Sequence, residues 1–139
     1  MTVAILKNAS VVFNSVDLSD HVEAIDIPAV LAKVMATTMG DDTERSIPGL
    51  KSSTITVTLQ QDYAGGSVDA TLWAAYYAGT SHSLVIKPDA GAVGAANPSY
   101  TVTAYVQSYP PISGAVGEIQ KPQVVFEISS GDLARSTGS

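Results

Sequence analysis

The chain has 139 residues, which suits one domain, and only 14% of them are charged, against about 25% in an ordinary soluble domain. Because interface cores are depleted in charge, this composition favours a subunit that buries part of its surface against neighbours over an isolated apolar β-domain. The net charge of −6 argues against binding to nucleic acid or anionic membranes, and the absence of cysteine excludes disulfides, cysteine zinc sites and thiol catalysis.

The start of the chain predicts strands and no targeting segment. The apolar run Val3 to Leu6 is too short for the core of a signal peptide, and no apolar stretch in the sequence reaches the roughly 18 residues of a membrane span. We therefore expect a soluble protein made in the cytoplasm, without a membrane partner. Lys7 to Phe13 and Val16 to Leu18 flank the turn-forming pair Asn14-Ser15 and predict a hairpin. The alternation from Val22 to Ile27 predicts a further strand.

The next segment, Pro28 to Ala36, fits two structures. Its apolar residues Val30, Leu31, Val34 and Met35 have helical spacing, and Pro28 suits the first turn of a helix. An extended conformation stays open on the residues alone.

An uncharged polar face follows in the middle of the chain. Within Thr54 to Asp62, polar residues alternate with the apolar Ile55, Val57 and Leu59, which predicts a strand with one buried side. Exposed sheet faces usually carry some lysine and glutamate, so an uncharged face favours a channel lining or strands shared between subunits. The alternative is a threonine-rich strand selected for β-propensity alone. The candidate channel face consists of Thr54, Thr56, Thr58 and Gln60.

One short helix is predicted, from Ser67 to Ala78. Ser67 is expected to cap it by accepting from the backbone N–H groups of Asp69 or Ala70, and Gly79 is expected to close it. One side of the helix is broadly apolar and is expected to pack on a sheet as core, through Val68, Leu72, Trp73 and Tyr76.

The rest of the chain predicts three strands, at Ser83 to Lys87, Ser99 to Gln107 and Gln123 to Ser129, joined by loops of small residues and proline. The second of these strands also has an uncharged polar side, so either sheet can face a channel. Gly131 to Ser139 lacks apolar periodicity and is predicted to be a flexible tail. We therefore expect a single mainly β domain over residues 1–130, a β-sandwich or barrel-like fold with one short flanking α-helix, followed by a tail over residues 131–139.

The sequence offers little catalytic chemistry. His21 and His82 are the only histidines, and neither belongs to a recognisable metal-binding motif. Common nucleophile and phosphate-binding motifs are absent. The acidic cluster of Asp41, Asp42 and Glu44 lacks EF-hand spacing, so a solvated loop is favoured over a divalent-cation site. We expect no enzymatic activity, no cofactor and no metal site.

Three motifs follow one another in the middle of the chain. Thr37 to Asp41 is T-x-M-G-D, Arg45 is followed by I-P-G-L-K at Ile47 to Lys51, which we interpret as a turn, and Val68 to Trp73 is V-D-A-x-L-W. In this order they resemble the major tail tube proteins of long, non-contractile bacteriophage tails, and weaker likeness extends over most of residues 11–129. The resemblance implies an assembly loop made by Thr38, Met39, Gly40, Asp41, Arg45, Ile47, Pro48, Gly49 and Leu50.

The resemblance also implies a structural role in the virion. In that family, a β-sandwich with a flanking helix forms hexameric rings, which stack into a hollow tube for DNA and the tape-measure protein. The corresponding loop or arm is Val30 to Leu50, so Pro28 to Ala36 is predicted to be extended, although it is apolar apart from Lys33 where the family's arm is often acidic. The implied partners are copies of this chain, the tape-measure protein and tail tip or terminator proteins. DNA would pass through the tube without specific binding.

Two other functions stay open. A tube protein of a gene transfer agent or of a secretion system predicts nearly the same physics. A carbohydrate-binding β-sandwich belongs to a different class and would use exposed aromatic side chains as stacking platforms, drawn from Trp73, Tyr76, Tyr77 and Tyr109. The expected burial of Trp73 argues against it.

Overall fold

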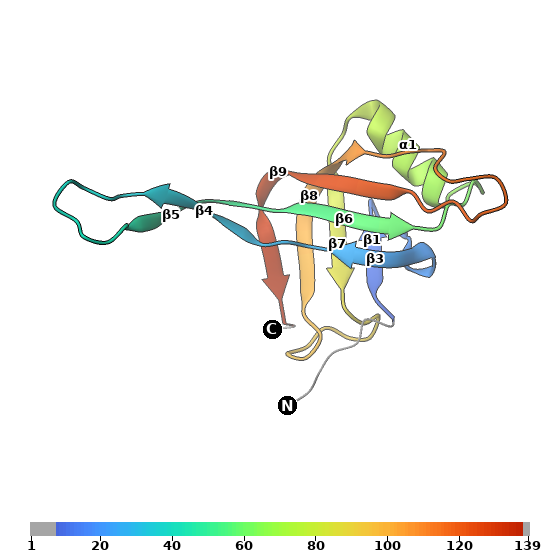
Figure 1. Cartoon of the computed structure of the whole chain (residues 1–139). Coiled ribbons are helices and arrows are strands. Elements are labelled where there is room, and N and C mark those ends of the chain that lie inside the picture. The colour runs from blue at the N-terminus through green and yellow to red at the C-terminus, as the bar shows by residue number, and fades with distance from the viewer. Residues whose placement is uncertain (1–7, 138–139) are drawn as a thin grey trace.

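Alternating apolar residues produce a seven-stranded antiparallel sheet with the strand order β2-β1-β7-β8-β9-β6-β3 (Figure 1). The structure is a computed structural model that describes residues 8–137. The strands of the sheet are β1 (Ser10–Phe13), β2 (Val16–Asp17), β3 (Val22–Asp26), β6 (Thr54–Leu59), β7 (His82–Lys87), β8 (Ser99–Ser108) and β9 (Gln123–Ser136). A separate two-stranded sheet is formed by β4 (Val30–Met35) and β5 (Ser46–Ser52). The expectation of a mainly β domain with one flanking helix is confirmed.

The predicted hairpin at the start of the described chain is present. Phe13 in β1 pairs with Val16 in β2, and the two residues between them have positive φ angles of 52° for Asn14 and 65° for Ser15. Two central residues with positive φ are the geometry of the tight hairpin turn that matches strand twist. Lys7, the predicted start of β1, lies outside the described residues.

The sheet bends in β9, its longest strand. The first part of β9 pairs with both β6 and β8, whereas its end, Ala134 to Ser136, pairs with β8 alone. Between these parts Gly131 has a φ of 69°, which glycine adopts without strain, and the register with β8 shifts there. Residues 131–136, predicted as a flexible tail, therefore continue the strand, because backbone pairing does not require apolar side chains.

The bend lets one sheet enclose a core. Figure 1 shows β3, β6 and the first part of β9 crossing in front of β1, β7 and β8. The apolar side of β6, formed by Ile55, Val57 and Leu59, is fully buried, and it packs with Phe13 from β1 and Phe126 from β9. The alternation predicted for β6 thus places its apolar side in the core, as expected.

The helix α1 (Val68–Ala78) begins one residue after the predicted start and ends where predicted, with Gly79 as the C-cap. Its N-terminal contacts differ from the expectation. The Ser67 hydroxyl donates to Asp62 Oδ2 at 2.8 Å rather than accepting from the helix, and the Asp69 N–H donates to the Asp62 carbonyl at 3.0 Å. Asp62, which follows the preceding strand, therefore supplies the contacts that Ser67 was expected to make.

Only part of the apolar side of α1 enters the core. Val68, Leu72 and Ala75 are buried, which confirms two of the four expected packing residues. Trp73 is 42% exposed and Tyr76 is 46% exposed, so their predicted burial is wrong. The sheet contacts one narrow strip of the helix, and residues next to that strip remain on the outside.

A buried tyrosine connects the helix to the loop after β8. Tyr109, 6% exposed, donates to Asp69 Oδ1 at 2.7 Å and accepts from Gln61 Nε2 at 2.8 Å. Burial raises the pKa of the Tyr109 phenol well above its ordinary value. Tyr109 is therefore a structural contact and not an exposed stacking platform.

Candidate assembly surfaces

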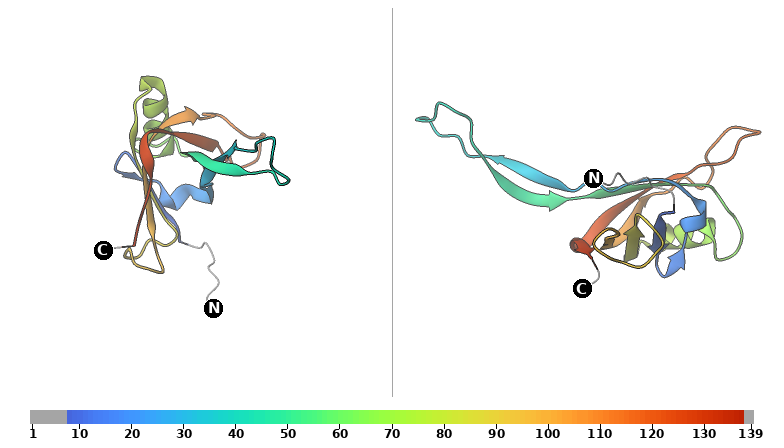
Figure 2. Two further views of the ribbon diagram at one scale, coloured as in Figure 1. Left: turned by 90° about the vertical axis from the view of Figure 1, so that its left-hand side faces the viewer. Right: turned by 90° about the horizontal axis from the view of Figure 1, so that it is seen from below.

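The most exposed element of the protein is an arm formed by β4 and β5. The two strands pair with each other and project from the body, as Figures 1 and 2 show. The prediction that Pro28 to Ala36 is extended is confirmed from Val30 to Met35. The segment Ile47 to Lys51, predicted as a turn, is instead the body of β5. Pro48 is compatible with that strand because each strand of a two-stranded sheet has a free edge, where no N–H is needed.

The arm has one face without charge. Val34 lies opposite Ile47, and Val30 lies opposite Ser52, so side chains two residues apart on β4 share this face. A Cβ on Gly49 would lie 2.9 Å from Val34 Cγ2 and 3.3 Å from Ala32 Cβ, which places Gly49 on the same side. We call this the apolar face of the arm; it consists of Val30, Ala32, Val34, Ile47 and Gly49.

The opposite face of the arm is basic. It carries Leu31, Lys33 and Met35 from β4, with Lys51 opposite Leu31 and Pro48 opposite Lys33. On the apolar face, Val30, Val34 and Ile47 are each about half exposed. Because these side chains are exposed in the described part of the chain, the apolar face is available for a partner.

The tip of the arm is held by one carboxylate. Asp41 Oδ2 accepts from the Thr38 N–H at 2.7 Å and the Thr38 hydroxyl at 3.0 Å, and it pairs with Arg45 Nη2 at 2.9 Å. These contacts lower the pKa of Asp41, chiefly through the Thr38 backbone N–H. Met39, between these residues, is fully exposed. The tip is therefore an ordered turn that presents a methionine.

The predicted assembly residues thus fall into two places. Five of them form the tip, and the other four lie along β5. The tip residues are Thr38, Met39, Gly40, Asp41 and Arg45, and the β5 residues are Ile47, Pro48, Gly49 and Leu50.

The candidate channel residues do share one outer face. Thr54, Thr56, Thr58 and Gln60 alternate with fully buried residues. On the neighbouring strands, Asp26 lies opposite Thr56 and Glu127 opposite Thr54, and the Thr54 hydroxyl donates to Glu127 Oε1 at 3.0 Å. This part of the outer face therefore carries carboxylates beside its threonines.

The outer side of α1 carries an aromatic cluster. The ring of Trp73 lies 5.3 Å from that of Tyr76 and 6.2 Å from that of Tyr77, with interplanar angles of 39° and 32°. Tyr77 is the most exposed of the three. The tilt between the rings means that they do not form one flat platform.

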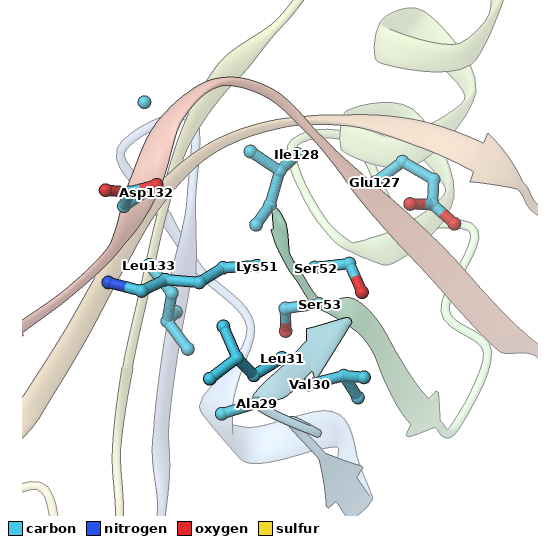
Figure 3. A pocket seen from close by; sticks show the side chains of 11 residues that line it. Ala29, Val30, Leu31, Lys51, Ser52, Ser53, Glu127, Ile128, Asp132 and Leu133 are labelled. Atoms are coloured by element: carbon cyan, nitrogen blue, oxygen red, sulfur yellow. The ribbon is translucent and has the colours of Figure 1, made fainter. Parts of the chain in front are cut away.

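A groove lies at the root of the arm, and the sequence did not indicate it. The groove has a volume of about 530 Å³ and is formed between the arm root and the bent part of β9 (Figure 3). Ser53, between β5 and β6, lines it; this side chain is 6% exposed, and its hydroxyl makes no hydrogen bond within residues 8–137. Ser53 is a polar residue at a position where the alternation of β6 predicts an apolar one. Its neighbours on β9 are some 75 residues away in the sequence, so no local pattern could show the groove.

The nearest approach to a catalytic arrangement involves His21. His21 Nε2 lies 3.1 Å from Asp62 Oδ2, and the Ser67 hydroxyl donates to the same oxygen. The serine therefore contacts the carboxylate and not the imidazole, which a nucleophilic serine would need as its base. Asp62 has a lowered pKa, chiefly because it accepts from the Ala64 N–H.

Metal ligands and membrane spans were also sought in residues 8–137. No group of three or more histidine or acidic side chains there is arranged to hold a metal ion. The helix found there is too short to cross a bilayer.

Comparisons with known proteins give a fold but no family. No protein-family model and no curated protein matches the sequence. Among solved structures, the chain is similar to the sheath/tube terminator of PVC, an extracellular contractile injection system, with a TM-score of 0.70, 11% identity and 98% of each chain covered. It is also similar to the Dit (gp 19.1) protein of phage SPP1, described as a hub adsorption apparatus, with a TM-score of 0.52 and 13% identity over 89% of this chain and 50% of that chain. The chain therefore has a fold found in a component of a contractile injection system and, over about half that protein's length, in a phage adsorption protein.

Proposed function

We propose that the chain is a structural subunit of a phage tail, and specifically the major tube protein of a long, non-contractile tail. Its rings, hexameric as the resembled family implies, would stack into a hollow tube around the tape-measure protein, and DNA would later pass through it. The subunit would be made in the host bacterial cytoplasm and reside in the virion. It would have no enzymatic activity and no cofactor.

The observation that carries this proposal is the arm. A two-stranded ribbon with an uncovered apolar face, Val30, Ala32, Val34, Ile47 and Gly49, is poorly suited to a free monomer. Burial of that face against other copies would stabilise an assembly, since apolar area removed from water contributes about 25 cal/mol per Å². The charge-poor composition and the resemblance of the tip and helix motifs to tail tube proteins agree with this role.

A second candidate is a terminator that caps a tube. It is favoured by the similarity to the PVC sheath/tube terminator, which covers 98% of both chains. The two candidates differ in assembly: a tube protein would add ring upon ring, whereas a terminator would bind only at the end of a tube.

The exposure of aromatic side chains on α1 favours the carbohydrate-binding alternative, but the absence of a flat stacking surface among them argues against it. Because Trp73, Tyr76 and Tyr77 are tilted relative to one another, we assign this cluster to protein contact. Tube proteins of gene transfer agents or secretion systems would assemble in the same way as a phage tail tube.

Negative-stain electron microscopy of the concentrated protein, alone and with tail tip components, tests the proposal. Tubes with a central hole support the tube protein, and single rings that bind tube ends support the terminator. A chain that stays monomeric under every condition would overturn both.

A matched pair of arm variants sharpens this test. Val34→Asp places a charge on the apolar face, whereas Met35→Asp places the same charge on the basic face one residue away. We expect Val34→Asp to abolish assembly while the monomer keeps its thermal unfolding transition, and Met35→Asp to assemble. Equal assembly by both variants would show that the apolar face is not the contact.

A further inference from the structure

The groove at the root of the arm contains polar groups without partners. Its apolar walls come from the arm root and from Ile128 and Leu133 of β9. The Ser53 hydroxyl is buried and makes no hydrogen bond within the described residues, and Figure 3 shows its oxygen on the side of Leu31 and Ala29. A buried polar group left unsatisfied is costly and rare in folded proteins. An occupant of the groove that offers this hydroxyl a hydrogen-bond partner would remove that cost.

The charged side chains of the groove are also available. Lys51 and Asp132 line it and make no ion pair within residues 8–137. Glu127 lines it as well but already accepts from the Thr54 hydroxyl. An occupant that combines apolar side chains, backbone donors and a carboxylate would match Ser53, Asp132 and Lys51 together.

Such a segment exists at the other end of the same molecule. The loop between β8 and β9 exposes three aliphatic side chains: Ile112 and Ile119 are largely exposed and Val116 is fully exposed. Glu118, at the same tip, makes no ion pair within the described chain. In both Figure 1 and the right-hand view of Figure 2, this loop and the arm project from opposite ends of the body.

The tip is held in shape at its base. The Tyr63 hydroxyl donates to the Pro111 carbonyl at 2.8 Å and lies 3.0 Å from Gln120 Oε1, and that oxygen accepts from the Ser113 N–H at 3.2 Å. A loop that is ordered before binding loses less conformational entropy on docking. Its exposed aliphatic residues are therefore presented on a stable turn.

We propose that the groove at the root of the arm receives the β8–β9 tip, residues 112–119, of a second copy of this chain. The contact joins two different surfaces of one protein, so it can repeat from copy to copy, either around a ring or along a stack. We assign it to stacking because the two surfaces lie at opposite ends of the body. Val116 and Ile119 would fill the apolar groove, and Lys51 would pair with Glu118. Ser53 and Asp132 would accept from backbone N–H groups of the glycine-containing tip. The inference rests on the proposed stacking function and adds which surfaces meet.

Disulfide trapping tests the contact directly, because the chain contains no cysteine. Ser52→Cys places a thiol on the exposed lining of the groove, and Val116→Cys places one on the tip. The two single-cysteine proteins are mixed, assembled and oxidised, and we expect covalent dimers that neither protein forms alone. The control is Ser52→Cys mixed with Thr80→Cys, at an exposed residue after α1.

The outcomes separate this inference from the proposed function. Tubes or stacked rings in which Ser52→Cys and Val116→Cys proteins crosslink no more than the control pair would overturn the docking while the tube function stands. A protein that neither assembles nor crosslinks at any concentration would overturn both. Covalent dimers that appear only for the predicted pair support the inference.

Two substitutions test the chemistry of the contact. Ser53→Ala removes an unsatisfied hydroxyl, so we expect an unchanged or higher melting temperature of the monomer together with a several-fold higher critical concentration for assembly. Lys51→Glu and Glu118→Lys should each weaken assembly, and the double variant should recover it. Ser53→Ala protein that assembles like the wild type, or charge variants that do not compensate, would contradict the assigned contacts.

Discussion

Asp62 is the residue at which three elements meet. Its carboxylate accepts from the Ala64 N–H at 3.0 Å and the Ser67 hydroxyl at 2.8 Å, and it contacts His21 Nε2 at 3.1 Å. These contacts lower the pKa of Asp62, with the Ala64 N–H as the largest cause. Because the folded pKa lies below the unfolded one, the ionised carboxylate stabilises the fold above its ordinary pKa, and this contribution is lost as the pH falls through the folded pKa.

The variant Asp62→Asn should therefore change the pH dependence of stability. We expect a lower melting temperature at neutral pH, because the amide cannot accept all three contacts, and a smaller loss of stability on acidification. Thermal unfolding from neutral to acid pH measures both effects. Asp42→Asn, at an exposed carboxylate of the arm tip, is the control and should follow the wild type. Parallel curves for Asp62→Asn and the wild type would show that Asp62 is not linked to folding.

At the scale of elements, α1 provides a direct comparison of buried and exposed positions. Leu72 is fully buried, whereas its neighbour Trp73 is 42% exposed. Leu72→Ala should lower the free energy of unfolding by about 2 to 5 kcal/mol, as is typical of core truncations. Full burial of Trp73 would imply about 3 to 5 kcal/mol for Trp73→Ala, but its exposure predicts a clearly smaller loss than for Leu72→Ala. Denaturant unfolding of both variants checks the order, and a larger loss for Trp73→Ala would mean that the tryptophan is buried.

The arm should matter for assembly and little for folding. Its strands pair only with each other in the described structure, and its tip is held by local contacts of Asp41 with Thr38 and Arg45. We expect shortening of residues Asp41 to Ser46 to leave thermal unfolding cooperative and within a few degrees of the wild type, while assembly is lost. Calorimetry and electron microscopy of the same preparation measure the two properties. Loss of soluble folded protein on shortening would contradict the independence of arm and body.

At the scale of the whole molecule, the charge of the chain predicts how the proposed tube would interact with DNA. The chain has a net charge of −6, and the candidate channel face, Thr54, Thr56, Thr58 and Gln60, has Asp26 and Glu127 beside its threonines. A wall of this kind offers phosphates no cations whose pairing would release counterions. We expect no retention of duplex DNA by assembled tubes even at low salt, where attraction is least screened.

Filter binding of labelled duplex DNA to assembled tubes measures this retention. Unassembled protein at equal mass is the control. Retention that falls as salt is added, or a channel lined by lysine in a structure of the tube, would contradict the mechanism. The outward side of β8 is the other candidate for the channel lining, and a structure of the tube also decides between the two faces.

Much of the local structure of this protein followed from its sequence, although Ile47 to Lys51, predicted as a turn, is part of β5. A strand at the surface of a core buries alternate side chains, so the alternation from Thr54 onward was enough to locate β6 and its buried side. Asn14-Ser15 likewise located the first turn, and Gly79 the end of α1. For the arm, the residues allowed helix or strand, and the resemblance to tail tube proteins favoured the extended form that is observed.

Long-range packing decided the rest, because it depends on which distant segments meet. Periodicity gave α1 a broad apolar side, but only the strip of the helix that packs on the core is covered, so Leu72 is buried and Trp73 is 42% exposed. The bend at Gly131 required a register shift against β8, which no local pattern indicates, and it turned a predicted tail into the end of β9. The same bend brings Leu133 across from Ser53. The groove at the arm root is therefore a product of tertiary structure alone, since its two sides come from segments far apart in the chain.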